Sequence, residues 1–158
     1  MSDGQGDVAR IIAPPPLLFF AYLGAAWGAD TLYSWNVEWA PVLPRIVAGF
    51  LLSAFAESLG AWAIWVMAKA KTPVEPWHPT ERIVKRGPFG LTRNPLYLVL
   101  TTMLLVMALV VNWGWFYLSV PFLFATLHFG VVMREERYLE GKFGDEYSSP
   151  KKRVRRWF

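Results

Sequence analysis

Four apolar runs dominate this chain and limit the folds that are open to it. They cover roughly residues 14–33, 44–70, 95–111 and 115–133. Several approach the length of about 20 residues that an α-helix needs to cross a bilayer. Hydrophobic residues make up 54% of the 158-residue chain, whereas a soluble domain of this size must cover a large surface with polar groups. We therefore predict an all-α integral membrane protein with about four transmembrane helices, in one domain over residues 1–158. A soluble protein with a very apolar core is the alternative.

Prolines, glycines and polar residues set the expected limits of the helices. The prolines at 14–16 lie early in the first run, and proline suits the first turn of a helix but damages its interior. The first helix should therefore begin near Pro16. Only residues 112–114 separate the third and fourth runs, which predicts a tight helical hairpin. A further helix is expected in the polar C-terminal stretch, with a stop at Gly144.

Lysine and arginine are distributed unevenly among the polar segments. The connection after the first helix contains only Arg45, and the hairpin tip contains none. The long second connection with its flank, and the C-terminal tail, contain Lys69, Lys71, Arg82, Lys85, Arg86, Arg93, Arg134, Arg137, Lys142, Lys151, Lys152, Arg153, Arg155 and Arg156. By the positive-inside rule, both of these segments and both termini lie in the cytoplasm. The start of the chain lacks the basic region and cleavage site of a secretory signal, so we expect the first apolar run to remain in the mature protein.

Composition excludes several kinds of site. The chain has no cysteine, and so no disulfide, thiolate metal site or cysteine nucleophile. With only two histidines we expect no dedicated metal site. A glycine-rich phosphate loop, HExxH and GxSxG are all missing. The basic end, Lys151 to Arg156, beside so much apolar sequence favours contact with anionic lipid over nucleic acid. Glu57 and His128 fall inside predicted spans, where ionisable residues are often functional, and the sequence identifies a partner for neither.

Asn94 and Pro95 predict the start of the third helix. Asparagine is a favoured N-cap and proline is favoured at the first helical position. The free N–H groups and the positive dipole end of this helix then suit a carboxylate or phosphate. Arg93 either pairs with a ligand anion or anchors the helix at the interface. Tyr97, on the first turn, either stacks on a ligand ring or belongs to the interfacial aromatic belt.

Two adjacent glutamates, Glu135 and Glu136, follow the last apolar run. At the membrane surface they either hold a cationic or hydroxyl-bearing ligand or belong to a solvated helix that also carries arginines. The stretches "RGPFGLTRNPLY" (86–97) and "EERYLEGKFGDEY" (135–147), in this order around an apolar hairpin, resemble the isoprenylcysteine carboxyl methyltransferase family and the related phospholipid N-methyltransferases. The resemblance covers roughly residues 80–158. It implies an integral membrane enzyme that uses S-adenosylmethionine.

The resemblance also implies which residues form the site, within a cofactor region of residues 80–97 and 134–158. Phe89 takes the place of the tyrosine in the family's G-P-Y motif, and Asn94 that of the commoner histidine in R-H/N-P-x-Y. Arg134 and Glu136 are the implied catalytic candidates. The implied cofactor-binding residues are Glu81, Arg82, Ile83, Val84, Phe89, Arg93, Asn94, Pro95, Leu96, Tyr97 and Glu135.

Three positions depart from the family's pattern. Pro150 stands where a second tyrosine is usual, and Arg156 replaces the proline-like residue of the basic end. The prenylcysteine-type enzymes carry an arginine one turn before the acidic pair, where this chain has about Val131, with only Arg134 nearby. We expect methyl transfer to a lipid-like or prenylated acceptor at the membrane, on either a carboxyl or an amine. The alternative is a non-enzymatic membrane protein that binds anionic lipid through its basic tail; a fused membrane reductase normally needs more than four spans.

Overall fold

The structure is a computed structural model, and it describes residues 8–38, 41–74 and 83–157. All regular secondary-structure elements of these residues are helices, and β-structure is limited to one isolated bridge between Asn36 and Trp113. The all-α prediction is therefore confirmed for the part of the chain that is described. The elements are α1 (Pro15–Leu32), α2 (Val42–Lys69), the 3-10 helix η1 (Gly87–Gly90), α3 (Pro95–Val111), α4 (Gly114–Leu127), the π-helical turn η2 (His128–Val132), α5 (Met133–Phe143) and α6 (Asp145–Arg153).

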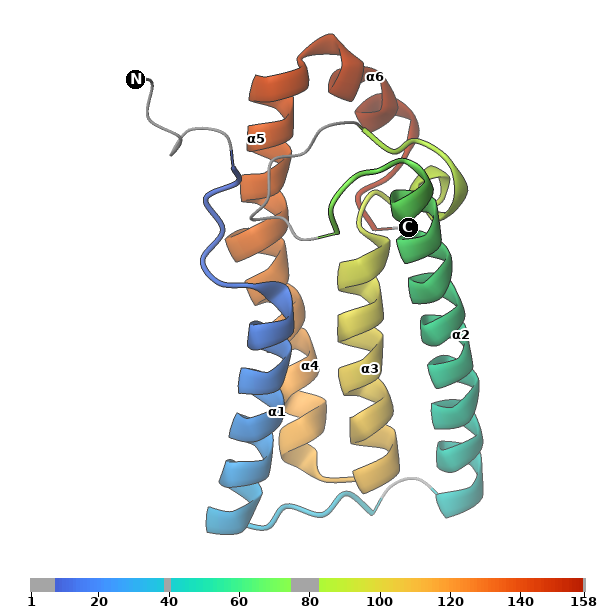
Figure 1. Ribbon diagram of the computed structural model, residues 1–158. Coiled ribbons are helices and arrows are strands. Elements are labelled where there is room, and N and C mark those ends of the chain that lie inside the picture. Colours follow the sequence, from blue (N-terminus) through green and yellow to red (C-terminus); the bar gives the residue numbers. More distant parts are fainter. Residues whose placement is uncertain (1–7, 39–40, 75–82, 158) are drawn as a thin grey trace.

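The long helices form a bundle with α3 near its centre (Figure 1). Helix α3 packs against α1, α2 and α4, and α1 also packs along α4. Small residues bring α2 close to α3, because a Cβ atom at Gly60 would lie only 3.6 Å from Val99. The core consists of fully buried apolar side chains, among them Leu104, Ala108, Phe116, Leu123, Leu127, Val131 and Val132.

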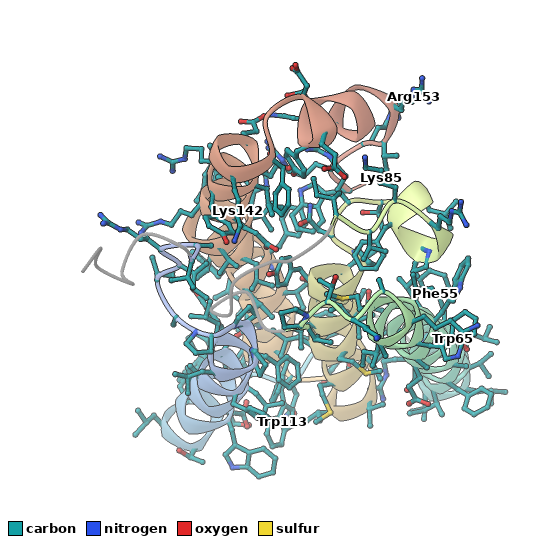
Figure 2. All side chains as sticks on the ribbon, turned by 45° about the horizontal axis from the view of Figure 1, so that its top comes forward. Phe55, Trp65, Lys85, Trp113, Lys142 and Arg153 are labelled. Carbon is teal, nitrogen blue, oxygen red and sulfur yellow. The ribbon has the colours of Figure 1, made fainter. Side chains whose placement is uncertain are left out.

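Within the described residues, two helices are long and apolar enough to cross a membrane. They are α2 and the continuous helix Gly114–Phe143, while α3 is apolar but has only 17 residues. The outer side of α2 carries exposed aromatic side chains, including Phe55 and Trp65, which lie on the side away from the other helices (Figure 2). Apolar side chains in this position suit contact with lipid.

The helix boundaries follow the sequence closely, with one difference. The first three long helices begin and end near the predicted limits, and α3 begins at Pro95 as expected. The fourth helix was expected to end at Met133. It continues instead through the π-helical turn η2 into α5, and ends at Phe143, where Gly144 has the predicted role of a helix stop with φ +50°.

The hairpin between α3 and α4 confirms the prediction for residues 112–114. Asn112 ends α3 in the left-handed conformation, with φ 63°. The amide of Gly114 donates a hydrogen bond of 2.7 Å to the carbonyl of Trp35, and a Cβ atom at this glycine would lie 2.1 Å from the indole of Trp35. Arg45 donates to the carbonyl of Val110, so a cation stabilises the C-terminal end of α3.

The long connection and the C-terminal tail meet at the opposite end of the bundle from this hairpin (Figure 1). The amide of Arg93 donates to the carbonyl of Arg155 over 3.1 Å. Lys85 lies 3.5 Å from the carboxylate of Glu146. The two polar segments in which the sequence predicts a cofactor site are thus in direct contact.

Candidate functional site

A buried tyrosine and a glutamate from distant parts of the sequence form the first element of the site. Tyr97 lies on the first turn of α3, and 9% of its surface is exposed. Its hydroxyl donates a 2.7 Å hydrogen bond to Oε2 of Glu135, in the first turn of α5. No described residue donates to the other oxygen, Oε1, of this half-buried carboxylate. Glu135 therefore keeps one acceptor atom for a ligand.

The neighbouring carboxylate of Glu136 lies between two guanidinium groups. Its side chain is only 6% exposed. Nη1 of Arg93 lies 2.8 Å from Oε1, and Arg156 donates from Nη2 to Oε2 over 2.8 Å and from Nε to Oε1 over 3.0 Å. The pair between Arg156 and Glu136 is thus bidentate, the strongest form of such a contact. These hydrogen bonds to Glu136 raise the pKa of Arg156.

Two donor atoms of Arg93 have no hydrogen-bond partner, although the side chain lies beside a carboxylate. Nη1 of Arg93 is at ion-pair distance from Glu136, but the two groups are not oriented for a hydrogen bond. Nε of Arg93 is also buried and has no hydrogen-bond partner. Buried donors of a charged group are rarely left without an acceptor. A ligand with a carboxylate or phosphate would supply one.

The last residues of the tail attach to the start of α3. The carbonyl of Arg156 accepts hydrogen bonds from Oγ1 of Thr92 and from Nδ2 of Asn94, both over 3.0 Å. The prediction that the Asn94 side chain caps α3 is therefore wrong, because its amide donates to the tail and makes no capping bond. The residue still occupies the position directly before the helix.

The tail also supplies a hydrogen-bond partner for His128, for which the sequence identified none. Nε1 of Trp157 donates to Nδ1 of His128 over 3.1 Å, and the indole packs against the ring of Phe124 with centroids 4.7 Å apart. His128 begins the π-helical turn, a form of helix that is frequent at functional sites. The other ionisable residue of a predicted span, Glu57, lies on the exposed side of α2 and accepts from Ser53 over 2.9 Å.

Tyr147, the last residue of the second stretch that resembles the family (135–147), contributes to the cluster from α6. Its side chain is 6% exposed. Burial, and then the negative charge of Glu136, raise the pKa of Tyr147 to about 12. Its hydroxyl therefore stays neutral throughout the physiological range.

The other implied site residues are distributed around this cluster. Pro95 is fully buried, while Leu96 and Phe89 are half-buried, the latter in the 3-10 helix. Ile83 and Val84 line a cavity of about 710 Å³ beside α2. Glu81 and Arg82 lie outside the residues that the structure describes.

Arg134 is not part of the cluster. Its side chain is exposed on the other side of α5, where Nη1 donates to the carbonyl of Arg10 over 3.1 Å. The burial of the preceding turn does not indicate this, because Gly130, Val131 and Val132, which precede Arg134, Glu135 and Glu136 by four residues, are all buried.

Arg156 and Trp157 are the members of the cluster that sequence reasoning missed. Both lie in the cofactor region 134–158 that the resemblance implies, but neither was assigned a role, and no local pattern indicates that residues 156 and 157 return to the start of α3 and to the helix Gly114–Phe143. Their position also weakens the alternative of a lipid-binding tail, because Arg156 is paired with Glu136 and Lys151 with Glu140.

Comparison with known proteins agrees with the geometry. A family model described as phospholipid methyltransferase matches residues 44–146, a region that includes Arg93, Tyr97, Glu135 and Glu136. The chain is also similar to an uncharacterised protein of Haemophilus influenzae, with 40% identity over 62 residues that make up 39% of this chain and 98% of that protein. No solved structure matches the chain. Arg156 and Trp157 lie beyond the region that the family model matches.

Proposed function

Because this chain belongs to the phospholipid methyltransferase family, we propose that it transfers a methyl group from S-adenosylmethionine to a lipid-like or prenylated acceptor at the membrane. The observation that carries the proposal is the contact between Tyr97 and Glu135, beside the cluster of Arg93, Glu136 and Arg156. It joins the two stretches that resemble the family's cofactor-binding motifs, at one end of the bundle.

The side chains of the cluster suit the polar groups of this cofactor. S-adenosylmethionine carries a carboxylate, an amino group and ribose hydroxyls. Oε1 of Glu135 is available to accept a hydrogen bond from a hydroxyl or amino group. Nε and Nη1 of Arg93 are buried donors without a hydrogen-bond partner, and they suit a carboxylate. Phe89, Leu96 and the ring of Tyr97 supply apolar surface, and the start of α3 at Pro95 supplies a positive dipole end.

Glu136 is a positioning residue in this proposal. Both of its oxygens accept from guanidinium groups, so it is poorly placed to remove a proton from an acceptor. It fixes Arg93 and Arg156 relative to each other, and through Arg156 it attaches the tail to the start of α3. The cofactor supplies a methyl group on a sulfonium, and its transfer depends largely on positioning, which can contribute several orders of magnitude to a rate.

The membrane arrangement is part of the same proposal. All four apolar helices cross the membrane within a single domain, and the cluster lies at the cytoplasmic face together with both termini. The concentration of lysine and arginine at this end of the bundle supports that orientation (Figure 1). The acceptor enters sideways from the lipid between helices, and it carries either an amine or a carboxyl group.

Binding of radiolabelled S-adenosylmethionine to the purified chain in detergent tests the proposal. We expect saturable binding that weakens about 10- to 100-fold in Tyr97→Phe and Glu135→Gln, since hydrogen bonds to charged groups contribute about 1.5–3 kcal/mol. Tyr22→Phe is the matched control. It removes a 2.7 Å hydrogen bond between the Tyr22 hydroxyl and Thr126 that joins α1 to α4 away from the cluster, so its affinity should stay within about twofold of the wild type. Binding that does not saturate, or that is equal in all these proteins, would overturn the proposal.

A further inference from the structure

A second group of arginines lies on the opposite side of α5 from the cluster. Arg134 and Arg137 project from this helix, and Arg10 joins them from the segment before α1. With Val8 and Tyr138 they line an open hollow of about 640 Å³. All three arginines are exposed, and none of the described residues that line this hollow is acidic.

The hollow is held together by specific contacts. Nη1 of Arg134 donates to the carbonyl of Arg10 over 3.1 Å, and Nε of Arg137 donates to the carbonyl of Met133 over 3.1 Å. The two bonds orient the side chains of α5 and attach the N-terminal segment to that helix. The cations are therefore partly preorganised, which lowers the entropic cost of binding a ligand between them.

Close packing next to the hollow fixes the N-terminal segment a second time. The amide of Ile12 donates to the carbonyl of Gly130 over 3.2 Å. A Cβ atom at Gly130 would lie 2.3 Å from Cδ1 of Ile12, so a larger residue at this position would require the Ile12 side chain to move. Residues 10–12 thus lie against the π-helical turn, and Arg10 is held beside α5.

The three arginines of the hollow differ from Arg93 and Arg156 in that no described carboxylate supplies a counter-charge beside them. Arg93 and Arg156 lie against Glu136, whereas no carboxylate of the described residues forms an ion pair with Arg10, Arg134 or Arg137. Like charges grouped in this way repel one another, and an anion placed among them removes the repulsion. A phosphate has the charge and the oxygen geometry that guanidinium groups bind best.

Exposed apolar side chains lie at the level of the π-helical turn that directly precedes α5. Ile12 is 50% exposed and Phe129 is 65% exposed, and both are at the level of the π-helical turn where the apolar helix α4 gives way to the polar helix α5. A ligand that fits this surface has an anionic headgroup and an apolar chain. Basic hollows of this kind at the ends of membrane helices suit anionic lipids.

We propose that Arg10, Arg134 and Arg137 bind the phosphate headgroup of an anionic phospholipid, whose acyl chains lie over Ile12 and Phe129. This site is separate from the cluster around Glu136 and does not depend on methyl transfer. It gives Arg134 a role in binding lipid in place of the catalytic role that the resemblance implied. It also differs from the C-terminal tail, to which the sequence alone assigned contact with anionic lipid.

Native mass spectrometry of the full chain in detergent tests this site. Phosphatidylglycerol and phosphatidylcholine with the same acyl chains are the probes, and we expect the wild type to prefer phosphatidylglycerol. The triple variant Arg10→Gln, Arg134→Gln, Arg137→Gln should lose that preference on the order of 100-fold, as each interfacial arginine contributes roughly tenfold or somewhat less. The single variant Arg137→Gln, whose one hydrogen bond is within its own helix, should lose up to about tenfold and keeps the test valid if the triple variant unfolds.

The matched control removes three cations elsewhere at the same end of the bundle, Lys69, Lys71 and Arg86, each changed to glutamine (Figure 1). Its preference should stay within about threefold of the wild type. An equal loss in the control would show attraction by overall charge and would overturn the proposal. Glycerol phosphate is the second arm. Weak competition by it supports a lipid site, whereas full competition at lipid-like concentrations would assign the hollow to a soluble phosphate and overturn the lipid assignment.

Discussion

The two sides of α5 use the same residue types in opposite ways. On the inner side Glu136 is buried between Arg93 and Arg156, and Glu135 is bound by Tyr97. On the outer side Arg134 and Arg137 are exposed without a carboxylate partner among the described residues. The four charges are consecutive in the sequence, so the helical period alone separates them. The charges on the inner side therefore largely compensate one another and leave only Oε1 of Glu135 and the donors of Arg93 for a ligand, whereas the guanidinium groups on the outer side have no such compensation among the described residues.

The largest expected effect is on the free energy of unfolding. It comes from comparing a buried carboxylate with a partly exposed one on the same helix. Glu136→Ala leaves two guanidinium groups in a largely buried position without their counter-charge, which should lower the free energy of unfolding by about 3–5 kcal/mol. Glu140→Ala is the matched control, because its pair with Lys151 is about one-third exposed and should contribute less than about 1 kcal/mol. Denaturation in detergent, followed by circular dichroism, measures both. If both variants lost the same free energy of unfolding, the buried position of Glu136 would have no special role in stability.

A smaller effect is expected from the partner in the tail. Arg156→Ala removes the bidentate bonds to Glu136 but keeps the backbone carbonyl that accepts from Thr92 and Asn94. The loss should be about 2 kcal/mol, since Arg93 continues to compensate part of the carboxylate's charge. Arg153→Ala, at an exposed position of α6, should change stability by less than about 0.5 kcal/mol. A cost at Arg153 as large as at Arg156 would mean that the tail stabilises the protein through its overall charge.

The pH dependence of stability gives a third comparison. The pKa of Tyr147 is raised to about 12 from its ordinary value of 10.0, so the folded state favours the neutral phenol. Its contribution to stability is complete below pH 10 and is lost as the pH rises towards 12, by about 2 kcal/mol at most. Tyr147→Phe should remove this part of the alkaline loss, which unfolding of both proteins between pH 9 and pH 12 measures. Identical pH profiles would contradict the burial of the phenol beside Glu136.

Local features of this fold could be predicted from the sequence, because their causes are local. Pro95 begins α3, residues 112–114 form the hairpin tip, and Gly144 ends α5, since proline fixes φ near the helical value whereas glycine and asparagine tolerate the positive φ that ends a helix. The position of Arg134 was not predictable in this way. It was grouped with Glu136 because it is the arginine nearest to the position that the resemblance assigns to one, and its side chain lies on the other side of α5.

The features that could not be predicted depend on contacts between residues that are far apart in the sequence. The side-chain oxygen of Asn94 was expected to cap its own helix, but the side chain makes no capping bond and its Nδ2 atom donates to the carbonyl of Arg156 instead. Nothing local to Arg156 or Trp157 indicates that either residue returns to the start of α3 or to His128. The two motifs that the resemblance joined do meet, through Tyr97 and Glu135.

Transfer of a labelled methyl group tests the central claim most directly. We predict that the purified chain, given S-adenosylmethionine tritiated on the methyl group and a lipid extract, moves label into the organic phase. The rate should fall at least about tenfold in Tyr97→Phe, whose hydrogen bond to Glu135 carries the proposal, and stay within about twofold in Tyr22→Phe. If a preparation that binds the cofactor leaves no label in the lipid, or if the two tyrosine variants behave alike, the inner side of α5 is not the site of methyl transfer.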